Sequence, residues 1–236
     1  MIEVEWWEFE DLETMAGEVA GDIGFIIEKA IETNGKAELA LPGGQTPQPI
    51  LEKLATRDFD WSKVRVFPTN ERIVEAGSEY SNFEMLERIL GPTGAMVEPI
   101  LDHDQQWSTK EAGQSADARL AGFSWPVDLV WLGIGADGST ASIFPAQMDA
   151  AIDTPKTRRA VGVTPDPMPE EAPVDRVTMT RPALLDTHTM IVTLAGAEKK
   201  QLLEKAIADG PLSNVPIGRV LAEAMIPIDI YWSART

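Results

Sequence analysis

The sequence contains no cysteine, and histidine is nearly as scarce, because His103 and His188 are the only two among 236 residues. The missing thiols exclude disulfide bonds, a cysteine nucleophile and thiolate ligands for a metal ion. With so few imidazoles, a zinc site would depend mostly on carboxylates, so we expect no metal. A chain without cysteine also suits a reducing compartment, and we therefore expect a cytoplasmic protein.

Basic residues are few as well. The chain has 20 lysines and arginines against 38 aspartates and glutamates, which gives a formal net charge of -18. Nucleic acids and anionic membranes bind basic surfaces, so we expect neither as a partner. No apolar run approaches the ~18 residues that cross a bilayer, and the acidic start MIEVEWWEFEDLE is unlike a signal peptide. An anionic substrate therefore requires cations gathered in one place. The oligomeric state stays open.

Short apolar segments alternate with amphipathic ones through most of the chain. The predicted strands are residues 37–41, 64–67, 97–101, 127–132, 160–163, 176–180, 190–194 and 228–232. The predicted helices are residues 11–33, 47–55, 82–90, 109–121 and 198–208. This alternation predicts an α/β fold, a three-layer sandwich with a mainly parallel, doubly wound sheet.

A proline-rich segment, residues 164–173, is the only candidate for a domain boundary. At ten residues it is more typical of a surface loop or a lid over a site than of a domain linker. We therefore expect one domain over residues 1–236.

The first candidate site is the glycine turn in LALPGGQTPQPILEKLA, between a predicted strand and a predicted helix. Glycines let the backbone approach an anion, and the free amides at the start of the helix point at it. Gly43, Gly44, Gln45 and Thr46 are therefore a candidate phosphate site. The spacing is neither a P-loop nor a dinucleotide fingerprint, and a plain tight turn with a helix cap would use the same residues.

Polar side chains also follow three other strands. Arg72 is a forked cation for phosphate or sugar oxygens, and Asn70 beside it can orient a group without accepting its proton. The remaining candidates are Glu71, Ser81, Asn82, Asp137, Ser139, Arg176 and Lys199. Because the carboxyl ends of parallel strands meet at one edge of a sheet, we expect these residues to converge on one crevice.

Together the four stretches resemble the 6-phosphogluconolactonase family, which shares a superfamily with glucosamine-6-phosphate deaminase and ribose-5-phosphate isomerase. The matching residues run in the family's order through nearly the whole chain. They are Gly43, Gly44, Thr46, Pro47, Glu71, Arg72, Ser81, Asn82, Asp137, Gly138, Thr140, Ala141, Ser142, Phe144, Pro145, Arg176, Thr178, Thr180, Gly196, Ala197, Glu198 and Lys199. The resemblance implies a fold of the sugar-phosphate isomerase and CoA-transferase type.

The resemblance also implies an activity, hydrolysis of the lactone of 6-phosphogluconate in the pentose phosphate pathway without a cofactor. The expected partner is thus a small phosphorylated sugar lactone. Carried over position by position, Gly43, Gly44, Thr46, Arg72 and Lys199 correspond to the phosphate and substrate clamp, and Arg176 faces the substrate.

Two positions depart from the family pattern. Ser139 stands where the family has a histidine that is implied as the general base, and Asn70 stands where it has aspartate. A serine hydroxyl cannot deprotonate water at neutral pH without a neighbouring base. Asp137 or Glu71 can replace the lost base, whereas we expect His103 and His188 to be surface or helix-end residues.

Three functions therefore stay open. The first is a lactone hydrolase with altered base chemistry. The second is a sugar-phosphate binding protein without catalysis, which would keep the clamp and lose the proton-transfer groups. The third is a sugar-phosphate isomerase or deaminase, which would need acid and base groups at the two changed positions even more than a hydrolase does.

Overall fold

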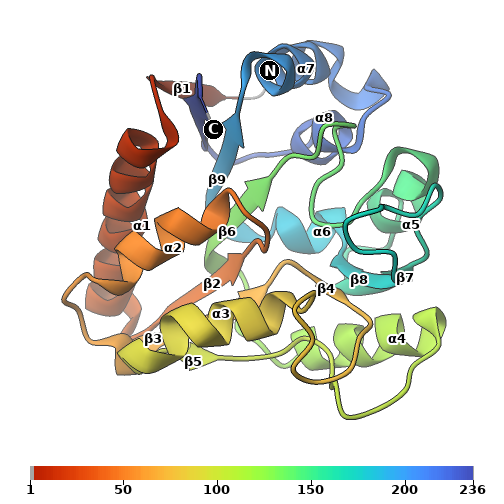
Figure 1. The fold of residues 1–236 in the computed structure, drawn as a ribbon, viewed down its shortest axis with the longest axis horizontal. Coiled ribbons are helices and arrows are strands. Elements are labelled where there is room, and N and C mark those ends of the chain that lie inside the picture. The colour runs from red at the N-terminus through yellow and green to blue at the C-terminus, as the bar shows by residue number, and fades with distance from the viewer. Residues whose placement is uncertain (1–2, 236) are drawn as a thin grey trace.

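The computed structural model describes residues 3–235, and its centre is a seven-stranded parallel sheet (Figure 1). The strand order is β1-β10-β9-β6-β2-β3-β5. The strands are β1 (Val4–Phe9), β2 (Ala37–Leu41), β3 (Val64–Pro68), β5 (Met96–Val97), β6 (Val127–Gly133), β9 (Thr187–Ala195) and β10 (Ile228–Ser233). Among the described residues, no helix has both the length and the apolarity to span a bilayer.

Helices cover both faces of this sheet, as the predicted three-layer fold requires. One face carries α1 (Leu12–Asn34), α2 (Pro47–Ala55) and α3 (Asn82–Leu90). The other carries α4 (Thr109–Leu120), α5 (Met148–Ile152), α6 (Arg181–Leu184), α7 (Ala197–Asp209) and α8 (Pro216–Leu221). Strand β6 shows the division, because Leu129 and Trp131 join the first apolar core while Val130 and Leu132 join the second. The α/β fold class predicted from the sequence is confirmed.

The helices begin and end where the sequence supplies caps. The side chain of Asp11 accepts a hydrogen bond of 2.8 Å from the amide of Thr14 and starts α1. Gly35, with a φ of 78°, ends the same helix in the left-handed conformation that glycine adopts without a steric cost. Between these caps, buried apolar residues at the 3.6-residue period fix which side of α1 faces the sheet.

A second, antiparallel sheet differs from the predicted pattern. It consists of β4 (Asn70–Arg72), β8 (Arg176–Met179) and β7 (Ala160–Val163), in the order β4-β8-β7. The sequence predicts strands over residues 160–163 and 176–180, but its pattern does not indicate that they pair in a separate sheet. Strand β4 was not predicted, because its three residues are polar and resemble a loop.

Smaller differences occur at the edges of the main sheet. Strand β5 has two residues, whereas the sequence predicted a strand over residues 97–101. Strand β1 pairs with β10 at the sheet edge and was not predicted, because its side chains are only partly buried and show no apolar run. The short helices α5, α6 and α8 were missed because four to six residues are too few to show a period.

Candidate active site

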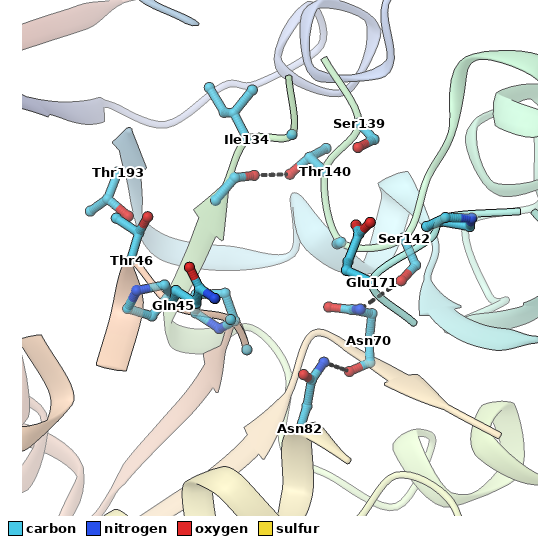
Figure 2. A pocket seen from close by; sticks show the side chains of 18 of the residues that line it. Gln45, Thr46, Asn70, Asn82, Ile134, Ser139, Thr140, Ser142, Glu171 and Thr193 are labelled. Atoms are coloured by element: carbon cyan, nitrogen blue, oxygen red, sulfur yellow. Dashed lines mark hydrogen bonds between the residues drawn. The ribbon is translucent and has the colours of Figure 1, made fainter. Parts of the chain in front are cut away.

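A cavity of about 590 Å³ opens at the carboxyl ends of β2, β6 and β9 and beside β4 (Figure 2). Most of the residues singled out in the sequence line it. They are Gly43, Gly44, Gln45, Thr46, Asn70, Arg72, Asn82, Ser139, Arg176 and Lys199. Glu71, Ser81 and Asp137 lie nearby but do not line it. The expected convergence of these strand ends thus brings cations, amides and hydroxyls around one space.

The glycine turn forms one side of the cavity, and each glycine is needed for a different reason. Gly44 has a φ of 106°, which disfavours any residue with a Cβ. At Gly43 an added Cβ would overlap the side chain of Asn82. Thr46 precedes α2 and makes no side-chain capping hydrogen bond, so its hydroxyl is left for a ligand. The turn therefore presents backbone and hydroxyl groups to the cavity at the start of a helix.

Lys199 reaches the same cavity from the first turn of α7. Burial lowers the pKa of this ammonium group, and the negative charge of Asp137 acts in the opposite direction. Lys199 thus supplies a partly desolvated cation, which interacts with an anion more strongly than a lysine in open water does.

Two arginines supply a second positive region. Arg72 on β4 and Arg176 on β8 are direct partners in the antiparallel register. Both Nε atoms are buried and have no hydrogen-bond partner within residues 3–235. Burial, and then the neighbouring charge of Arg72, lowers the pKa of Arg176 to about 10. Two adjacent cations with free donors form a site that an anion would stabilise.

Asparagine side chains connect this arginine pair to the glycine turn. Asn82 donates through Nδ2 to the carbonyl oxygen of Asn70 at 2.6 Å, and its Oδ1 accepts a hydrogen bond from Arg72. Asn70 in turn donates through Nδ2 to the hydroxyl of Ser142 at 2.6 Å. Ser142 has a φ of 60°, a strained conformation that presents its hydroxyl to Asn70. The chain of amides therefore orients Arg72.

Glu71 is fully buried and faces away from the cavity, toward α3. Its Oε1 accepts hydrogen bonds from the backbone amides of Arg72 at 2.7 Å and Asn82 at 2.8 Å. Its Oε2 accepts from the amide of Phe83 at 2.7 Å and from the Ser81 hydroxyl at 3.2 Å. A carboxylate so occupied holds the start of α3 in place and has no access to a substrate.

Ser139 and Asp137 lie in the turn after β6, and only one of these two candidate residues reaches the cavity. Ser139 lines the cavity, whereas Asp137 is exposed and does not. The Oδ1 of Asp137 accepts a hydrogen bond of 3.0 Å from the amide of Ser139. This contact shapes the turn and is the kind of local bond that aspartate often makes there.

Neither histidine lines the cavity. His188 is exposed near the amino end of β9, whereas the cavity lies at the carboxyl ends of the strands. His103 is only 9% exposed, so the expected surface position of this residue is wrong. Its Nδ1 donates to the carbonyl oxygen of Val74 at 2.9 Å, and its Nε2 lies 3.5 Å from Oε2 of Glu71. The ring is buried behind β4, and no short-range pattern in the sequence pointed there.

Several lining residues were not among the sequence-based candidates for the site. They include Thr193 and Leu194 of β9, Phe144 after the β6 turn, and Pro169 and Glu171 of the proline-rich segment. Residues 164–173 were expected to form a surface loop or a lid over a site, but none of them was named as a site residue. Their place shortly before the strand of Arg176 is a further signal for Glu171.

Comparison with known proteins identifies the family. The family model described as glucosamine-6-phosphate isomerases/6-phosphogluconolactonase matches residues 10–232. The chain belongs to this family. A 6-phosphogluconolactonase of Rhizobium meliloti is 36% identical over 228 residues, which are 95% of this chain and 97% of that relative. A 6-phosphogluconolactonase of Pseudomonas putida is 34% identical over 228 residues, which are 95% of this chain and 91% of that relative.

Solved structures of the family have the same fold. The crystal structure of a 6-phosphogluconolactonase from Shewanella baltica has a TM-score of 0.87 at 28% identity and covers 98% of both chains. That of a 6-phosphogluconolactonase from Thermotoga maritima has a TM-score of 0.83 at 25% identity, covering 98% of this chain and all of that one. The mainly parallel sheet flanked by helices is thus the family's architecture.

Proposed function

We propose that the protein hydrolyses 6-phospho-D-glucono-1,5-lactone to 6-phospho-D-gluconate, a reaction of the pentose phosphate pathway, in the cytoplasm. The observation that carries the proposal is that one cavity is lined by a lysine of α7, Lys199, and by two paired arginines of β4 and β8, Arg72 and Arg176. The substrate has two matching features, a phosphate and a carbonyl that becomes negative during hydrolysis. The names of the relatives support the same substrate.

The phosphate belongs, in this proposal, at the glycine turn. Gly44 lets the backbone approach closely, and Thr46 and Lys199 add a hydroxyl and an ammonium group. Two of the first three residues of α2, Pro47 and Pro49, have no amide hydrogen, so the amides would come mainly from the glycine turn. Such amides together with a partly desolvated lysine form a phosphate site. Binding there would fix the sugar ring in the rest of the cavity.

The lactone carbonyl then faces the arginine pair. When water attacks, negative charge develops on the carbonyl oxygen, and buried donors already pointing at that oxygen stabilise it without reorganising. Such donors are worth ~10²–10³-fold in rate each. Arg72 and Arg176 line the cavity, and their guanidinium groups would supply these donors. They would also bind the carboxylate of the product.

A second candidate function is binding of a sugar phosphate without catalysis. It is favoured by the absence of any histidine among the lining residues, and by Ser139 at the position of the family's implied base. Ser139 can hold a water molecule in place, but its hydroxyl does not accept a proton at neutral pH.

The deciding experiment follows hydrolysis of freshly generated 6-phosphogluconolactone against its spontaneous rate. Wild type is measured beside Ser139→His and Asp137→Asn. Acceleration by wild type supports the hydrolase, and its survival in Asp137→Asn would exclude the exposed aspartate as the base. If wild type binds 6-phosphogluconate without accelerating the reaction, and Ser139→His accelerates it, the protein is a binding protein.

A further inference from the structure

A hydrolase built on this cavity requires a proton acceptor, and the lining residues contain one carboxylate. The titratable side chains that line the cavity within residues 3–235 are Arg72, Glu171, Arg176 and Lys199. Arginine and protonated lysine are donors, so Glu171 is the acceptor among these four at neutral pH. The acids considered from the sequence, Asp137 and Glu71, do not line the cavity.

The position of Glu171 is fixed by its neighbour in the chain. Ala172 is buried, and its carbonyl oxygen accepts a hydrogen bond of 2.7 Å from Nη2 of Arg176. The loop is thus attached to the arginine pair one residue from Glu171, and Pro169 of the same loop also lines the cavity. In Figure 2 Glu171 lies on the side of Asn70 and Ser142, away from Gln45 and Thr46.

The carboxylate is close to the arginines without being bound to them. Burial lowers the pKa of Arg72 and of Arg176, and the negative charge of Glu171 opposes this shift in both. Yet neither arginine forms an ion pair with Glu171 within 4.0 Å among the described residues. Glu171 lines the cavity and is exposed. Its oxygens therefore remain free to accept a hydrogen bond from water.

We propose that Glu171 is the general base of the lactone hydrolysis and takes over the task for which Ser139 is unsuited. This inference rests on the proposed function. Glu171 accepts a proton from a water molecule as the water oxygen bonds to the lactone carbonyl carbon, and the carbonyl oxygen becomes negative beside Arg72 and Arg176. When the carbonyl re-forms, the bond between that carbon and the ring oxygen breaks. Glu171 returns its proton to the ring oxygen, which becomes the hydroxyl of the product, and the new carboxyl group releases a proton to solvent.

The test replaces the carboxylate and uses its neighbour as the control. Glu171→Gln keeps the size of the side chain and removes the proton acceptor, whereas Glu170→Gln changes an exposed acid next to it that does not line the cavity. We expect Glu171→Gln to lower kcat by about 10²–10⁴-fold, the usual contribution of general base catalysis. Its affinity for 6-phosphogluconate should stay within a few-fold of wild type, and Glu170→Gln should retain wild-type kcat.

Two further measurements separate catalysis from a structural role. Formate added to Glu171→Ala supplies a small carboxylate, so it should restore part of kcat in a concentration-dependent way. The dependence of kcat/KM on pH should also differ between wild type and Glu171→Gln, and it should be the same in wild type and Glu170→Gln. A Glu171→Gln protein with wild-type kcat, or one that loses affinity rather than kcat, overturns the inference and leaves the proposed function in place. A wild type that does not accelerate hydrolysis overturns both.

Discussion

Gly43→Ala should disturb the orientation of Arg72 without altering any charged residue. The new Cβ would overlap Oδ1 and Cγ of Asn82, which is only 2% exposed and has little room to move. Asn82 would have to rotate, and its hydrogen bonds to Arg72 and to the carbonyl oxygen of Asn70 would break. A substitution at Gly43 in the turn would therefore alter the orientation of Arg72 on β4 through Asn82.

The size of the effect follows from the bonds that are lost. A hydrogen bond to a charged group is worth about 1.5–3 kcal/mol. If that orientation of Arg72 is used in the transition state, kcat/KM should fall by roughly 10–150-fold, because each 1.36 kcal/mol is a factor of ten. The buried carbonyl of Asn70 would also lose its partner, so the free energy of unfolding should fall by about 1–3 kcal/mol.

A double-mutant cycle gives the control. Asn82→Ala removes the same hydrogen bonds and the atoms that the new Cβ would meet. Gly43→Ala should therefore have little further effect on kcat/KM in the Asn82→Ala background. Steady-state kinetics with 6-phosphogluconolactone and thermal unfolding of all four proteins measure the cycle. Full additivity of the two substitutions, or wild-type kcat/KM in Gly43→Ala, would show that Asn82 does not couple Gly43 to Arg72.

Three other substitutions test the phosphate site, the packing of α4 and the buried histidine. Lys199→Gln should weaken the preference for the phosphorylated lactone, because it removes a charged hydrogen bond to phosphate. The kcat/KM for 6-phosphogluconolactone divided by the kcat/KM for glucono-1,5-lactone should fall by about 10–100-fold. An unchanged ratio would place the phosphate elsewhere. Gly162→Ala should lower the free energy of unfolding, measured by denaturant titration, by about 1–3 kcal/mol, because the new Cβ would overlap the first carbonyl oxygen of α4. The control is Gly17→Ala on α1, which has open space around it and should leave the free energy of unfolding unchanged. Burial lowers the pKa of His103, but hydrogen bonds to Glu71 and to the backbone outweigh it and raise the pKa above 6.5. The protonated ring thus stabilises the fold at low pH, and this contribution should be lost as the pH rises through the folded-state pKa. The difference in unfolding free energy between wild type and His103→Gln should shrink over that range, and a constant difference would contradict the assignment.

The sequence predicted best the elements whose ends are marked by specific residues. Helices α2 and α3 have the predicted bounds, because a proline at the first turn of one and a serine cap before the other define where each begins. Most of the predicted clamp also lines the cavity, because parallel strands deliver the residues after their carboxyl ends to one edge.

The rest depended on contacts between distant segments. The antiparallel pairing of β4 with β8 places Arg72 opposite Arg176, and no periodicity in either segment encodes that register. The same pairing brings the proline-rich loop, and with it Glu171, to the cavity. His103 is buried because residues 70–74 and α3 close over it, which a lone histidine in a polar stretch does not reveal.

Proton release at constant pH during hydrolysis of 6-phosphogluconolactone tests the proposed hydrolase activity most directly. Each turnover produces one ionised carboxyl group near pH 7, so base consumption reports the reaction without a coupling enzyme. We predict a rate above the spontaneous one that increases in proportion to the concentration of wild-type protein. A rate equal to the spontaneous one, with 6-phosphogluconate still bound in a separate titration, would contradict it and leave a binding protein.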